Sequence, residues 1–180
     1  INSIEIVNMK ENRGHARCIA SGLKYIFEKK EFDFVIPMDG DGEDRPEEIK
    51  NFIEFSEKSG GKSLVGDRVK RSEGLIFKTC YQFHKFLTLA FTGQSIKFGN
   101  FTCLSKSTVK KLLDEKATWN SFSGSLKKVE KELISIPSTR GKRYFGPSQM
   151  SFFNLLKHSL SIISVFRKTV LIRSALFIIF

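Results

Sequence analysis

Apolar positions recur at helical and strand spacing through the first forty residues of the chain. Between about residues 15 and 30, Ile19, Leu23, Ile26 and Phe27 fall on one face of a predicted helix. A compact apolar run over 32–38 predicts a strand buried on both faces. Residues 4–9 predict a shorter strand. Strand, helix and strand in this order predict a right-handed parallel crossover.

The alternation of elements continues to about residue 136. A helix is expected to open at Arg45-Pro46-Glu47-Glu48, capped by Asp44, and to end at Gly60-Gly61. Further strands are expected over 63–65, 98–104 and 133–136, and further helices over 73–92 and 105–114. The fold class predicted from this order is α/β, a mixed sheet flanked by helices, with residues 1–148 forming one domain.

The C-terminal residues follow a different pattern. Residues 149–167 predict a helix with a broad apolar face, typical of helices that lie in a membrane interface. Residues 168–180 are nearly free of charge and predict the start of a transmembrane segment. The chain begins at Ile1 and stops inside an apolar run, so both ends of the natural protein are expected to be missing.

Charge supports a membrane partner. The net charge is +11, and the segment 133–180 holds no acidic residue. Such a tail suits an anionic membrane surface and would also suit nucleic acid, but its apolar content favours the membrane, so no nucleic-acid partner is expected. Three cysteines in or beside apolar runs indicate buried thiols and a reducing compartment. The predicted location is the cytoplasmic face of a membrane.

The strongest chemical signal is the acidic loop Asp39-Gly40-Asp41-Gly42-Glu43-Asp44, at the end of the predicted buried strand. Asp39 and Asp41 offer hard oxygen ligands suited to Mg²⁺ or Mn²⁺, and such a cation can bridge a diphosphate. Gly40 and Gly42 leave room for a ligand to approach the backbone. The alternative is a solvated acidic turn before a helix. An EF-hand is excluded, because its sixth and twelfth positions would be Asp44 and Lys50.

Several motifs together resemble glycosyltransferase family 2, in the branch that contains dolichol-phosphate mannose synthase and bacterial polyprenyl-phosphate glycosyltransferases. The motifs that carry the resemblance are Asn12-Arg13-Gly14-His15-Ala16, Met38 to Glu47, Gly66-Asp67-Arg68, Gly99-Asn100-Phe101 and Arg140-Gly141-Lys142-Arg143-Tyr144. The resemblance covers nearly the whole chain. It implies a GT-A fold, related to Rossmann-like nucleotide-binding sheets, with the first strand absent from this sequence.

The resemblance also implies roles for individual residues. Asp39 and Asp41 would bind the metal and the donor diphosphate, with Glu43 near the metal. Asn12 and Gly14 would lie near the donor nucleotide, and Arg68 would contact phosphate. Arg140 and Arg143 would face an acceptor phosphate or lipid headgroups at the membrane surface, away from the donor diphosphate. The branch usually has a Gly-Asp-Phe-Arg motif where this chain has Gly99-Asn100-Phe101-Thr102.

These observations lead to the hypothesis of an inverting, metal-dependent transferase of hexosyltransferase type. Its donor is a nucleotide-diphosphate sugar and its preferred acceptor is a polyprenyl phosphate. Asn100 is grouped with Asp39 and Asp41 as catalytic; it can orient a hydroxyl but cannot act as a base. Three alternatives stay open: transfer to a glycan hydroxyl, a non-catalytic basic protein that binds membranes or nucleic acid, and an inactive relative.

Overall fold

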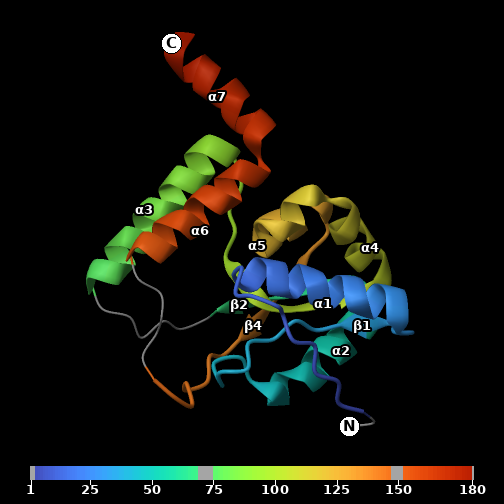
Figure 1. The fold of residues 1–180 in the computed structure, drawn as a ribbon. Helices are drawn as coiled ribbons and strands as arrows, with labels where there is room; N and C mark the ends of the chain where they lie inside the picture. Colours follow the sequence, from blue (N-terminus) through green and yellow to red (C-terminus); the bar gives the residue numbers. More distant parts are fainter. Residues whose placement is uncertain (1–2, 69–74, 147–151, 180) are drawn as a thin grey trace.

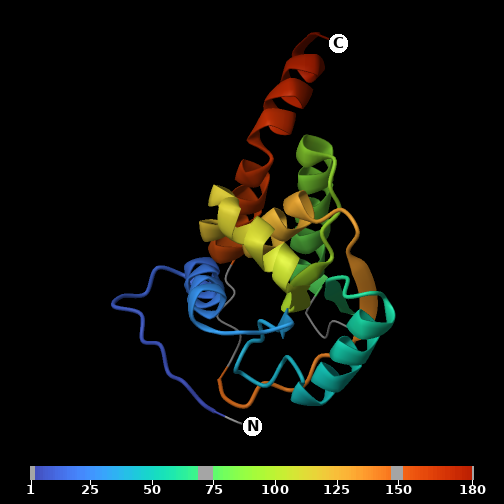
Figure 2. The ribbon, with the colours of Figure 1, turned by 90° about the vertical axis from the view of Figure 1, so that its right-hand side faces the viewer.

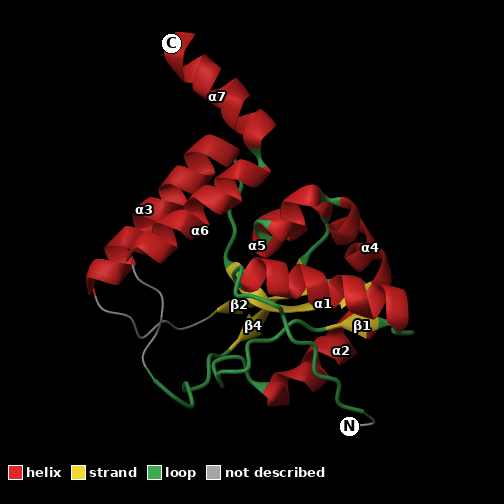
Figure 3. Cartoon of the chain, in the orientation of Figure 1, coloured by secondary structure: helices red, strands yellow, loops and turns green. Residues whose placement is uncertain are grey.

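The structure is a computed structural model that describes residues 3–68, 75–146 and 152–179, and its centre is a mixed four-stranded sheet (Figures 1 and 3). The strands are β1 (Phe34–Val35), β2 (Leu64–Arg68), β3 (Phe98–Ser105) and β4 (Ile134–Ser138), in the spatial order β1-β3-β2-β4. β3 runs antiparallel to both of its neighbours, whereas β2 and β4 are parallel. The α/β class and the mixed sheet predicted from the sequence are confirmed.

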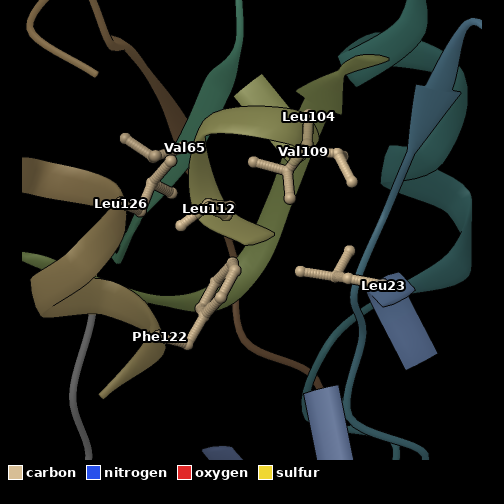
Figure 4. Close-up of a cluster of buried hydrophobic side chains, with 7 residues drawn as sticks. All are labelled: Leu23, Val65, Leu104, Val109, Leu112, Phe122 and Leu126. Carbon is tan, nitrogen blue, oxygen red and sulfur yellow. The ribbon is translucent and has the colours of Figure 1, made fainter. Parts of the chain in front are cut away.

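Helices cover both faces of the sheet. On one face lie α1 (His15–Lys29), α4 (Lys106–Asp114) and α5 (Phe122–Val129), with the short 3₁₀ helix η2 (Lys116–Trp119) between the last two. Their apolar faces meet Val65 and Leu104 of the sheet in a buried cluster (Figure 4). On the other face, the 3₁₀ helix η1 (Pro46–Glu48) leads into α2 (Ile49–Lys58), whose Phe52 packs on β2, β3 and β4.

Three further helices form a separate group beside the sheet: α3 (Leu75–Thr92), α6 (Phe152–Val165) and α7 (Arg167–Ile179). Leu155 and Ile162 of α6 are buried, and α6 packs against α3 and α5. α7 extends beyond the rest of the molecule in both views (Figures 1 and 2). Within the described residues, no helix is both long enough and apolar enough to cross a membrane, so the transmembrane segment predicted from residue 168 is not confirmed.

One strand prediction is wrong and a second is confirmed only in part. Residues 4–9 form no strand, and Ile4 and Ile6 are exposed. The strand expected over 32–38 is only two residues long, is half-buried, and pairs antiparallel with β3. The predicted parallel crossover is therefore absent from residues 4–38. Apolar spacing identifies residues that suit a strand, but a strand forms only where a partner supplies the second half of its hydrogen bonds.

The packing of α2 gives a matched pair of substitutions. Phe52 is 1% exposed, and the centroid of its ring lies 4.6 Å from that of Phe101. Phe55 on the same helix is 53% exposed. We expect Phe52→Ala to lower the free energy of unfolding by about 3–5 kcal/mol, because it leaves a cavity under the sheet. Phe55→Ala should change it by less than about 1 kcal/mol. Chemical denaturation of both variants measures the difference; equal effects would contradict this packing.

Candidate functional site

The acidic loop follows β1 and lies at the end of the β1–β3 pair. The pairing Phe34↔Ser105 and Val35↔Leu104, continued by four residues, sets Asp39 opposite Asn100. The Asn100 side-chain amide donates a hydrogen bond of 3.3 Å to Asp39 Oδ1. Two of the three residues predicted as catalytic are thus in contact, and the sheet register is what brings them together.

Hydrogen bonds within the loop fix its shape. The buried carboxylate of Asp44 accepts the backbone N–H of Asp39 at 3.0 Å, and Asp41 Oδ1 accepts that of Glu43 at 3.0 Å. Gly42 has φ 89°, a left-handed conformation that favours glycine. The expected capping role of Asp44 is wrong, because Arg45 occupies the N-cap position of η1 and no side chain caps it. Asp44 instead holds the two ends of the acidic loop together.

A second loop, residues 139–146 after β4, closes over the first. Gly141 N–H donates to the carbonyl of Glu43 at 2.9 Å, and Tyr144 N–H donates to that of Asp41 at 2.8 Å. The start of this basic loop is anchored by Glu48 of η1, which accepts Ser138 Oγ at 2.7 Å and Thr139 N–H at 2.9 Å. The two loops are therefore joined through their backbones.

Charged side chains complete the contact between the loops. Arg143 pairs with Asp41 at 3.1 Å and with Glu43 at 3.3 Å, and Arg140 pairs with Glu43. These four residues, here called the charge clasp, are partly buried: the Glu43 side chain is 17% exposed and that of Arg143 is 24% exposed. The expectation that Arg140 and Arg143 lie away from the predicted donor residues is wrong, because the structure puts them in direct contact.

The close approach of the two loops depends on glycines. A Cβ at position 141 would overlap the carbonyl oxygen of Gly42, and a Cβ at position 42 would lie 2.7 Å from the ring of Tyr144. The space expected beside Gly42 for a ligand is thus filled by Tyr144. A Cβ at Gly40 would meet nothing within 4 Å, so the backbone there is open.

The remaining predicted donor residues lie on other elements. Asn12 Oδ1 accepts the Gly14 N–H at 3.0 Å in the turn before α1, and both residues are exposed. Arg68 ends β2 and is paired in register with Ser138, two residues before Arg140, so its backbone lies beside the start of the basic loop. The side chain of Arg68 lies outside the described part of the structure.

The residue types of the acidic loop suit a hard divalent cation, since Asp39, Asp41 and Glu43 carry carboxylate oxygens and lie within five residues of sequence. The present contacts of these carboxylates differ from those of a metal site. Among the described residues, no three Asp, Glu, His or Cys side chains are grouped closely enough to hold a metal ion. Asp41 and Glu43 contact arginines instead. Binding of Mg²⁺ or Mn²⁺ stays a prediction that requires these carboxylates to exchange partners.

Two residues of the site were not found from the sequence. Glu48 reads as an ordinary acid in the first turn of a helix, yet it anchors the basic loop. Tyr144 reads as part of a basic motif, yet its ring fills the space beside Gly42. Neither role has a local sequence signal, because each depends on a partner about 90 or more residues away.

Comparison with known proteins gives a distant similarity. No family model matches the chain. The chain is similar to undecaprenyl-phosphate 4-deoxy-4-formamido-L-arabinose transferase of Photorhabdus laumondii subsp. laumondii, at 25% identity over 167 residues. The match covers 86% of this chain and 47% of that protein, so the chain spans about half the length of this curated relative.

The close backbone contact of the two loops predicts unequal effects of two glycine substitutions. Gly141→Ala should separate the loops, because the added methyl group overlaps the Gly42 carbonyl. The Tyr144 amide would then lose its acceptor, and hydrogen exchange there should be about tenfold or more faster. Gly40→Ala, where the added methyl group meets nothing, is the control and should leave exchange unchanged. Equal protection of Tyr144 in both variants would show that the loops are not held in this way.

Proposed function

We propose that this chain is the catalytic part of an inverting glycosyltransferase with a GT-A fold. It moves a sugar from a nucleotide-diphosphate donor to a polyprenyl phosphate at the cytoplasmic face of a membrane. The observation that carries the proposal is the contact of Asp41 and Glu43 with Arg140 and Arg143, in the same loop as Asp39, where the chain leaves β1 and β4. The distant similarity to an undecaprenyl-phosphate sugar transferase supports the same reaction class.

In this proposal Asp39 and Asp41, with Glu43 beside them, would hold Mg²⁺ or Mn²⁺. The cation would neutralise negative charge on the departing nucleoside diphosphate. Asn100 positions the Asp39 carboxylate by donating a hydrogen bond to it. The open backbone at Gly40 leaves room for the donor to approach. Asn12, Gly14 and Arg68 are assigned to the nucleotide and its phosphates.

The basic loop is assigned to phosphate recognition. Arginine presents its donors as a planar fork that matches phosphate oxygens. Arg140 already has a donor to spare: its Nε is buried and, in the described part of the structure, has no hydrogen-bond partner. The guanidinium groups of Arg140 and Arg143 would be released at the same end of the sheet if Asp41 and Glu43 took a cation as their partner instead. They can then hold the phosphate of the acceptor.

The absence of a carboxylate at position 100 favours a phosphate acceptor. An ionised phosphate oxygen is already nucleophilic and needs no general base. It attacks the anomeric carbon as the bond from that carbon to the donor phosphate oxygen breaks, and the electron pair leaves with the diphosphate. Attack opposite the leaving group inverts the configuration. A sugar hydroxyl would need a base, and Asn100 cannot serve as one.

The assignment of the acidic loop is tested by calorimetric titration of the chain with Mn²⁺ and nucleoside diphosphates. Asp39→Asn and Asp41→Asn should each weaken metal-dependent nucleotide binding by about tenfold or more, because each removes a charged ligand. Asp33→Asn, an exposed aspartate just before β1, is the matched control and should bind as wild type. Unchanged binding in both loop variants would rule out the metal assignment.

The charge clasp predicts the opposite effect on metal binding for a substitution in the basic loop. Arg143→Ala should tighten binding of Mn²⁺ alone by about two- to fivefold, since a partly exposed ion pair that competes for Asp41 and Glu43 is worth roughly 0.5–1 kcal/mol. In a turnover assay with a polyprenyl phosphate, the same variant should raise the acceptor KM.

Exposed Lys142 lies next to Arg143 and provides the control for both readouts, because Lys142→Ala changes charge without breaking the clasp. Wild-type acceptor kinetics in Arg143→Ala, or a product extended at a sugar hydroxyl, would overturn the phosphate-acceptor assignment. Weaker Mn²⁺ binding in that variant would show that Arg143 does not compete for the carboxylates.

A further inference from the structure

The group formed by α3, α6 and α7 exposes large apolar side chains on all three helices. On α6, Leu156 and Leu160 are exposed at helical spacing, while Leu155 and Ile162 on its other side are buried. On α3, Phe86 is 66% exposed and Leu89 is 50% exposed. On α7 the exposed apolar residues are Leu171, Ile172, Leu176, Phe177, Ile178 and Ile179. Apolar surface of this extent marks an interaction site in a folded protein.

The same three helices have a one-sided charge. None of them contains an aspartate or glutamate. Lys157 on α6 and Arg167 and Lys168 at the start of α7 are exposed. On the sheet domain, in contrast, exposed lysines are interleaved with acids, as in the pairs Lys106–Glu31 and Lys62–Glu132. An apolar surface whose charges are all positive is complementary to a bilayer with anionic headgroups.

An arginine of α7 attaches this helix to the end of α3. Arg173 Nη1 donates a 3.0 Å hydrogen bond to the carbonyl of Ala90 in the last turn of α3. A guanidinium is favoured there, because the end of a helix has free carbonyls and a partial negative charge. Gly93 makes room for it, since a Cβ at that position would lie 2.7 Å from Arg173. The first turns of α7 are therefore fixed to α3 as well as to α6.

We infer that α3, α6 and α7 form one docking surface for an anionic lipid bilayer, in which α3 takes part as fully as the two C-terminal helices. The inference extends the membrane location in the proposed function and does not depend on the transfer reaction. A second copy of the chain fits this surface less well, because two surfaces that both lack acids would repel each other. A bilayer containing anionic lipid supplies the missing negative charge.

Removal of the C-terminal helices would not test this surface cleanly. Leu155, Ile162 and Val165 of α6 are buried, and α6 packs on α5 of the sheet domain. A chain ended at Gly146 would therefore expose part of its core and could bind vesicles through that. Substitutions of exposed residues avoid the difficulty, and the fluorescence of the single tryptophan, Trp119, shows whether each variant is folded.

The test uses co-flotation of the 180-residue chain with vesicles of phosphatidylcholine, with and without phosphatidylglycerol. The double variant Phe86→Glu, Leu89→Glu should bind anionic vesicles at least about tenfold more weakly, because two apolar side chains are no longer transferred from water into the bilayer. Phe55→Glu is the matched control: Phe55 is an exposed phenylalanine on α2, and its replacement should leave binding unchanged. Wild-type binding by the α3 variant, or equal loss in the control, would overturn the inference.

A charge series separates anionic lipid from apolar adhesion. Lys157→Ala, Lys168→Ala should reduce the preference for phosphatidylglycerol by about fivefold for each lysine. The control pair Lys110→Ala, Lys131→Ala, which are exposed lysines of the sheet domain, should keep the preference. Equal loss in both pairs would overturn the docking surface, as would a chain that dimerises through Phe86 and Leu89 and does not bind vesicles. Flotation needs no sugar donor, so its result can be interpreted even if the chain does not catalyse the transfer reaction.

Discussion

The site depends on the pairing of Asp41 and Glu43 with Arg140 and Arg143. Three carboxylates within five residues repel one another when partly buried, and they need cations nearby. The basic loop supplies these cations together with two backbone hydrogen bonds. Gly42 and Gly141 allow the loops to come close enough for both kinds of contact. The two loops therefore cannot change shape independently of each other.

The strands determine which side chains reach this edge of the sheet. The antiparallel register of β1 and β3 sets Asn100 beside Asp39, 61 positions apart in the sequence. The parallel register of β2 and β4 sets Arg68 beside Ser138, where the basic loop begins. Glu48 then ties this point to the helix that follows the acidic loop. Four strands and one 3₁₀ helix thus position a cluster that is built from two short loops.

Most of the helices could be predicted from the sequence because their signals are local, although η2 and α5 were not expected. The apolar face of α1 and the glycines after α2 set the bounds of those helices to within a few residues. Asp39, Asp41, Arg140 and Arg143 could be singled out by residue type and motif, although their proposed roles remain to be tested. Their contact with each other could not be predicted, because it depends on strand register and loop closure across about a hundred residues. The same reason explains the absent strand at 4–9 and the bond between Arg173 and Ala90.

The charge clasp and the docking surface are also linked along the chain. The basic loop is described to Gly146 and α6 begins at Phe152. Nine residue steps separate Arg143 from the first residue of α6, and an extended chain of that length spans at most about 32 Å, which sets an upper limit on their separation. In the proposed function, a lipid phosphate would compete with Asp41 and Glu43 for Arg140 and Arg143, so opening of the charge clasp would favour its binding. In the proposed function, a divalent cation bound with the donor would give Asp41 and Glu43 another positive partner and so favour opening. If the proposed function holds, the donor is bound before the lipid phosphate.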